Sequence, residues 1–211
     1  FVSSDVIARK VTSQVTRYLT GKFGEILVYD RPLSDTEIDT VEQYLGSKWG
    51  IALAGQEAPP DLTTGLVAHI PFDETTGAVA NDVTGNNNLA TLQGLDANQT
   101  SWIPGKIGGA LLLDGADDWG TMPISLGDDF SMALWMKTTS VGSWGNTWSV
   151  DQGILSGPQS TYGLTLSQGK LYFKYGPSDW KQTLSQINLG NWVHIVTSRE
   201  KSGSGSNGKF S

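Results

Sequence analysis

The pattern of apolar and polar positions predicts a chain made mostly of short β-strands. Strand-like runs follow one another after residue 65, and clusters of Gly, Asn or Ser separate most of them. The stretch Leu164–Phe173 predicts a β-hairpin, since two such runs meet across Gln168-Gly169. A series of strands without helices implies a two-sheet sandwich. The strands predicted in this part of the chain are 66–72, 109–114, 118–123, 129–138, 152–157, 162–167, 170–175 and 192–198.

One more strand is predicted nearer the N-terminus, at residues 22–30. Both of its faces are largely apolar, as is typical of a strand that is covered on both sides in a sandwich. Arg31-Pro32 predicts its end, because proline donates no hydrogen bond to a sheet. Simple alternation divides the side chains between two faces, with Phe23, Glu25, Leu27 and Tyr29 on one and Ile26 and Val28 on the other.

A short helix is predicted directly after this strand, near residues 35–49. Ser34 and Glu37 have the spacing of a capping box, and Leu33 and Ile38 have that of a hydrophobic staple. Gly50 supplies a stop signal at the C-terminal end. Between these signals apolar residues recur at helical spacing, namely Ile38, Val41, Tyr44, Leu45 and Trp49.

The composition of the chain argues against several classes of partner and site. The formal net charge is −7 and the pI is about 4.7, which argues against nucleic acid, because phosphate binding needs clustered Lys and Arg. The chain has no Cys, so disulfides and thiolate metal sites are excluded. No apolar run reaches the roughly 18–20 residues that span a bilayer, and we therefore expect no membrane insertion.

Six short motifs follow one another between residues 65 and 198, and their order points to a known protein family. They are Phe72-Asp73-Glu74, Asp82–Asn87, Trp102–Ala110, Leu113–Asp118, Phe130–Lys137 and Trp192–Val196. Together they resemble the front part of a bacterial laminin-G-like domain. That resemblance implies an all-β fold, a two-sheet antiparallel jelly-roll sandwich of the concanavalin-A-like type, with one short α-helix near residues 35–49.

The two parts of this family pattern occur in reversed order. Residues 1–51 resemble the closing strand and helix of such a domain, residues 52–64 with Pro59-Pro60 have the composition of a linker, and residues 65–211 resemble the first strands of a truncated domain. This order predicts a window on a longer, repetitive protein with neighbouring repeats as partners. Residues 1–51 either finish an upstream copy or fold back and complete residues 65–211. Strand complementation from a neighbouring molecule is a third version of the same pairing.

A catalytic-looking motif lies in the predicted helix. Glu37, Asp39 and Glu42 match E-x-D-x-x-E, the signature of laminarinase-type glucanases, which carry it on a strand with the carboxylates converging on one sugar. On a helix, with about 100° per residue, Glu37 and Asp39 point roughly 200° apart. Capping explains Glu37 without catalysis, so we expect no enzyme here.

Acidic and amide side chains gather in the turns at one end of the predicted sandwich. The family often holds a calcium ion there, and such a cation prefers oxygen-rich loops. The same side chains also cap turns by bonding to their own backbone, so both interpretations stay open. The candidate ligands are Asp73, Asp82, Asn86, Asp114 and Asp117, with Asp118 beside them.

Aromatic residues in predicted loops are candidates for ligand binding, because an exposed ring can stack on the apolar face of a sugar. These are Trp144, Trp148, Tyr162 and Trp180, whereas Trp102, Trp119, Trp135 and Trp192 occupy positions expected to pack in the core. His69 and His194 lie inside predicted strands and are expected to be structural.

These observations predict a non-catalytic binding module of a large extracellular or surface-bound bacterial protein, with a glycan or another cell-surface ligand as partner. The alternative is a structural repeat, or a subunit that polymerises by exchanging strands. A laminarinase-type glucanase would require Glu37, Asp39 and Glu42 on one strand face.

Overall fold

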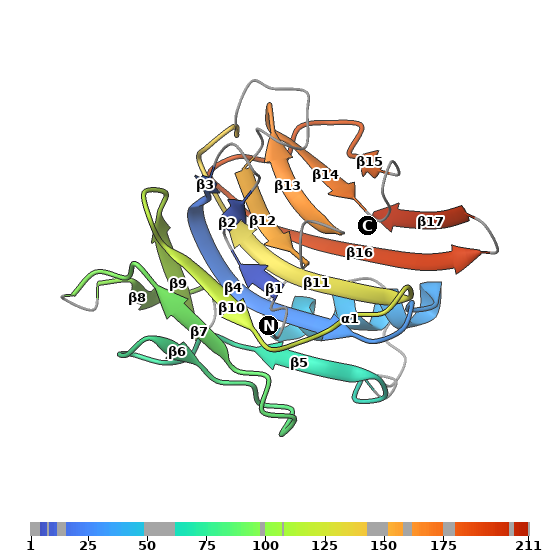
Figure 1. The fold of residues 1–211 in the computed structure, drawn as a ribbon, viewed down its shortest axis with the longest axis horizontal. Helices are drawn as coiled ribbons and strands as arrows, with labels where there is room; N and C mark the ends of the chain where they lie inside the picture. The colour runs from blue at the N-terminus through green and yellow to red at the C-terminus, as the bar shows by residue number, and fades with distance from the viewer. Residues whose placement is uncertain are drawn as a thin grey trace.

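The computed structural model is an antiparallel β-sandwich in which two large sheets enclose one apolar core (Figure 1). The residues that it describes are 5–7, 9–11, 16–48, 62–97, 100–106, 108–142, 152–157, 162–174, 180–202 and 205–210. The predicted linker, residues 52–64, lies almost entirely outside them. The all-β class and the accompanying helix are confirmed.

One sheet, named the β12 sheet below, contains eight strands. In spatial order they are β15 (Trp180–Gln182), β14 (Lys170–Lys174), β13 (Gly163–Ser167), β12 (Gln152–Ser156), β1 (Asp5–Ile7), β10 (Trp119–Met122), β7 (Ala90–Gln93) and β6 (Val79–Ala80). A hairpin of β2 (Arg9–Val11) and β3 (Thr16–Tyr18) contacts β12.

The opposite sheet, named the β4 sheet, contains seven strands. Its spatial order is β17 (Gly205–Phe210), β16 (Trp192–Ser202), β11 (Phe130–Lys137), β4 (Thr20–Tyr29), β9 (Gly109–Asp114) and β8 (Trp102–Pro104), and β5 (Leu66–Ile70) also pairs with β4. The helix α1 (Asp35–Lys48) packs on the outer face of this sheet.

The N-terminal segment supplies an interior strand to each sheet. Strand β4 pairs with β11 along one side, and on its other side with β9 near Lys22 and with β5 near Val28. Strand β1 likewise lies between β10 and β12. This is the pairing expected if the segment folds back onto residues 65–211 of its own chain.

A β-bulge at Gly24 changes the faces predicted for β4. Trp135 pairs with Glu25 but the next residue, Met136, pairs with Phe23, so Gly24 is the extra residue. An extra residue reverses the alternation beyond it. Phe23 therefore joins the core between the sheets, and the expectation that it shares a face with Glu25 was wrong.

Two apolar clusters cover the two faces of the β4 sheet. The larger fills the space between the sheets and takes Ile26 and Val28 from β4. The smaller lies between the sheet and α1. It consists of Leu27, Tyr29, Leu33, Ile38, Val41, Leu45, Ala133, Trp135 and Val196.

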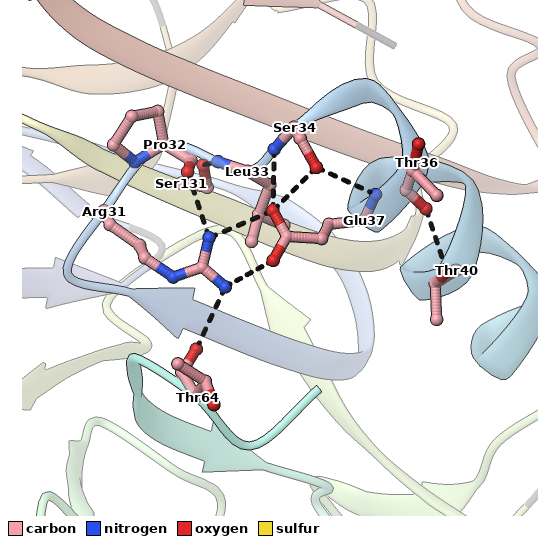
Figure 2. Close-up of polar contacts among 9 residues, drawn as sticks. All are labelled: Arg31, Pro32, Leu33, Ser34, Thr36, Glu37, Thr40, Thr64 and Ser131. Carbon is pink, nitrogen blue, oxygen red and sulfur yellow. Dashed lines mark hydrogen bonds and ion pairs between the residues drawn. The ribbon is translucent and has the colours of Figure 1, made fainter. Parts of the chain in front are cut away.

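The helix begins with the predicted capping box (Figure 2). The Ser34 backbone N–H donates to Glu37 Oε2 at 2.9 Å, and the Glu37 N–H donates back to Ser34 Oγ at 3.4 Å. Leu33 and Ile38 both lie in the smaller cluster, as expected of a hydrophobic staple. The Leu33 N–H donates to Ser131 Oγ at 2.9 Å, which anchors the start of the helix to β11.

The strands predicted after residue 65 are found within a few residues of their expected bounds, including the hairpin of β13 and β14. Gln168 and Gly169 both have positive φ, as its two-residue turn requires. The prediction missed β1, β2, β3, β6, β7, β8 and β15, which have two to four residues each and so show almost no period.

Replacing Ile26 tests whether β4 is part of this sandwich. Ile26 is fully buried between the sheets, so Ile26→Ala should lower the free energy of unfolding by about 3 kcal/mol through lost burial and a residual cavity. Urea unfolding, followed by tryptophan fluorescence, measures it. The matched surface variant Val83→Ala should change stability by less than about 0.5 kcal/mol. Equal stability of Ile26→Ala and the unchanged chain would contradict the placement of β4.

Candidate functional site

The four aromatic candidates have different outcomes. Trp144 and Trp148 lie outside the described residues. Tyr162 is buried, with its ring centroid 4.7 Å from that of Phe130, so the expectation of an exposed ring was wrong for it. Its position directly before β13 brings it into the core between the sheets. Trp180 is 55% exposed, as a ligand-binding side chain requires.

Trp180 lies beside Tyr172 on two neighbouring strands. The ring centroids are 5.6 Å apart and the ring planes are tilted by 37°. Leu171 and Phe173 of β14 point into the core, so Tyr172 lies on the outer side of the β12 sheet.

The same outer side carries polar residues. Lys170 and Lys174 alternate with the buried residues of β14, and cross-strand pairs place Trp180 opposite Lys174 and Gln182 opposite Tyr172. We name this surface the β14–β15 face. It consists of Lys170, Tyr172, Lys174, Trp180 and Gln182.

Three of the predicted metal ligands instead hold turns against strands. Asp73 Oδ1 accepts the Gly109 N–H at 2.8 Å, and the Asn86 side-chain amide donates to the carbonyls of Leu66 and Val67. Asp82 accepts backbone N–H groups on both carboxylate oxygens. Burial opposes its charge, but these hydrogen bonds outweigh burial and lower the pKa of Asp82.

The remaining predicted ligands do come together. Asp114, Asp117 and Asp118 each offer a carboxylate oxygen within 4.8 Å of the others, in the turn between β9 and β10. Asp118 is buried, and its Oδ2 accepts the Asp114 N–H at 2.8 Å. Burial raises the pKa of Asp118, with the neighbouring Asp114 and Asp117 charges adding to it. A cation could bind here, and Asp73 and Asp82 are not part of this group.

The glucanase-like motif lies on the helix α1, whereas glucanase chemistry needs it on a strand. The carboxylate of Glu37 is bound by the Arg31 guanidinium, at 2.6 Å and 3.0 Å, and by Ser34 (Figure 2). The bond from Arg31 is the main cause that lowers the pKa of Glu37 to about 2. Asp39 is exposed and Glu42 half-buried on the same helix. Glu37 therefore caps and anchors the helix.

A buried carboxylate that the sequence analysis overlooked joins three elements. Glu25 of β4 has no exposed surface, and its Oε1 atom is bound by Lys48 Nζ of α1 at 3.1 Å, by the Tyr44 hydroxyl of α1 at 3.3 Å, and by His69 Nε2 of β5. Burial opposes the charge, but the interactions with His69 and Lys48 outweigh it and lower the pKa of Glu25. The sequence does contain one sign of this site. Glu25 is a lone carboxylate on a largely apolar strand, and such a group must have partners when it is buried.

The second histidine lies nearby on the same face. His194 of β16 pairs with Trp135, and the two ring centroids are 5.1 Å apart. Burial lowers the pKa of His194 to about 4, so the ring is neutral at neutral pH. His69 and His194 thus lie on the outer face of the β4 sheet with half-buried side chains, and the His69 ring contacts the ring of Tyr44 of α1.

Comparison with protein-family models, curated proteins and solved structures finds no match for this chain. The laminin-G-like resemblance and the jelly-roll topology therefore stay predictions. None of the helical segments among the described residues has the length and apolar character to span a membrane.

Removing the Glu25 charge should destabilise the protein, because the Lys48 ammonium group would keep its position without a counter-charge. We expect Glu25→Gln to cost about 3 kcal/mol at pH 7, measured by urea unfolding. Since the pKa of Glu25 is lowered in the folded state, this contribution is complete above about pH 4.5 and is lost as the pH falls further.

Glu42→Gln is the matched control. Burial raises the pKa of Glu42, so its charge opposes folding and its removal should leave stability unchanged or slightly increased. A Glu25→Gln protein as stable as the Glu42→Gln protein would refute the role given to Glu25.

Proposed function

We propose that this chain is a non-catalytic binding module of a large extracellular or surface-bound bacterial protein, and that it binds carbohydrate through the β14–β15 face. The observation that supports this most directly is the ring pair of Trp180 and Tyr172, with Trp180 55% exposed. The localisation rests on the laminin-G-like resemblance.

The β14–β15 face has the chemistry that sugar recognition requires. A tryptophan ring buries a large apolar area when a ligand covers it, and a rigid ring loses little conformational entropy on binding. The apolar face of a pyranose could stack there, while Gln182 offers both a donor and an acceptor to its hydroxyls. Because β14 and β15 are regular strands, these side chains keep a fixed spacing.

We also propose that the Asp114, Asp117 and Asp118 group binds calcium. Three carboxylates in one turn repel each other, and a hard cation with oxygen ligands would relieve that repulsion. In this role calcium stabilises the turn between β9 and β10.

The strand-exchanging subunit is less well supported than the binding module. Strands β1 and β4 are interior strands of their own chain's sheets, so exchange would first require breaking pairs on both sides of each. A spacer role that uses no exchange would leave the Trp180 ring without a ligand.

Replacing Trp180 tests the binding function. A glycan array carrying neutral and acidic sugars, probed with and without calcium, identifies the best ligand, and calorimetry then measures its affinity. Trp180→Ala should weaken binding about thirty-fold, because a central aromatic contact contributes about 2 kcal/mol. Leu184→Ala removes an apolar side chain that is 96% exposed and should bind as the unchanged chain does. An array that stays blank under both conditions would refute the function.

Calcium binding is tested by thermal unfolding. With a dissociation constant of about 1 mM, typical of extracellular sites, 10 mM calcium should raise the Tm by about 4 °C. Asp117→Asn should abolish that rise. Asp73→Asn, a change to another exposed aspartate outside the group, should preserve it. Equal Tm values with calcium and with a chelator would contradict the site.

A further inference from the structure

Two lysines flank the aromatic ring of Tyr172 on the β14–β15 face. Lys170, Tyr172 and Lys174 occupy alternate positions of β14, so all three lie on the outer side of the sheet while Leu171 and Phe173 are buried. Alternate residues of an antiparallel strand are about 6.8 Å apart, and the two lysines are therefore about 14 Å apart along the strand.

Strand β15 adds an aromatic residue to this side of the sheet, and it carries a third lysine at a position of the alternate set. Trp180 pairs directly with Lys174, so its ring and the ammonium group project from the same side of the sheet. Lys181, the next residue, pairs with Phe173 and belongs to the alternate set of positions. The strand pair therefore carries two lysines that share a surface with the aromatic rings and one that does not.

The charge of this surface contrasts with that of the whole chain. The chain has 14 Lys and Arg against 21 Asp and Glu, but the five residues of the β14–β15 face include two lysines and no acid. Burial lowers the pKa of Lys174, which means that its ammonium group is partly removed from water.

We propose that the ligand of the β14–β15 face is an acidic polysaccharide, whose carboxylate or sulfate groups bind Lys170 and Lys174 while its sugar rings stack on Tyr172 and Trp180. The inference rests on the proposed function and specifies its ligand class. An acidic polysaccharide repeats its anionic groups along one chain, so two of them can reach two lysines about 14 Å apart. Duplex DNA carries one charge per about 1.7 Å and needs many more cations on an otherwise acidic protein.

Matched polysaccharides that differ only in charge test this proposal. The first pair of probes is polygalacturonate and its fully methyl-esterified form, which has the same backbone without carboxylates. The second pair is dextran sulfate and dextran. Affinity electrophoresis and calorimetry, at low and at physiological salt, compare all four with the unchanged chain. We expect a charged member of one pair to bind at least about ten-fold more tightly than its neutral partner, and more weakly as salt rises.

Lysine variants locate the effect. Lys170→Gln/Lys174→Gln should weaken binding of the charged probe about ten-fold and leave binding of the neutral probe unchanged, since two ion pairs of half-buried lysines are lost. Lys181→Gln removes one charge from the same strand pair on the other side and should have little effect. Urea unfolding of both variants checks that each is folded.

The outcomes separate this proposal from the proposed function. Equal binding of charged and neutral probes, lost in Trp180→Ala but unaffected by the lysine changes, would overturn the acidic ligand and preserve carbohydrate binding. Failure of all four probes and a blank glycan array would overturn both. Tighter binding of a single-stranded oligonucleotide than of either charged polysaccharide would also overturn the proposal.

Discussion

The pairing of β4 on both of its sides is the constraint on which the rest of the structure depends. Its backbone N–H and C=O groups are buried in the middle of a sheet, so they must find partners along both edges. Strand β11 supplies one edge, and β9 and β5 divide the other. Because β4 and β1 come from the first part of the chain, both sheets form around residues that are far in sequence from their partners. The stability of the whole sandwich should therefore depend on the N-terminal segment.

Strand β4 has both of its faces covered, so the Glu25 carboxylate on it is buried and needs partners. The bulge at Gly24 directs Phe23 to the core between the sheets and leaves Glu25 on the side of α1. A charge there cannot reach water, and it persists because Lys48, Tyr44 and His69 bind it. The Glu25 carboxylate therefore holds α1 and β5 at a fixed distance from each other, because it contacts residues of both. The apolar contacts of Leu27 and Tyr29 with the helix then follow from the same geometry.

Much of the fold could be predicted from local patterns, because long strands and capped helices have local causes. The alternation over residues 130–137 and the Ser34–Glu37 box identified β11 and the start of α1. Strands such as β6 are too short to show a period, and their positions follow from partners elsewhere in the chain. The ligand-binding candidates were harder to predict than the strands, since placement near a loop does not separate the buried ring of Tyr162 from the exposed ring of Trp180. Glu25 was missed because its partners are 19 to 44 residues away.

The two sheets differ in what lies against them. Helix α1 packs on the outer face of the β4 sheet, and the hairpin of β2 and β3 contacts β12 of the other sheet (Figure 1). Strands β14 and β15 lie at the end of the β12 sheet, where the residues of β15 are exposed. Edge strands commonly carry lysine, which discourages pairing with other chains. The edge strand here is β15, whereas the two lysines that flank Tyr172 lie on β14, which pairs with β13 and β15, and edge protection does not require the rings of Tyr172 and Trp180 beside them. The combination of cationic and aromatic side chains on one regular face therefore favours ligand binding over edge protection alone.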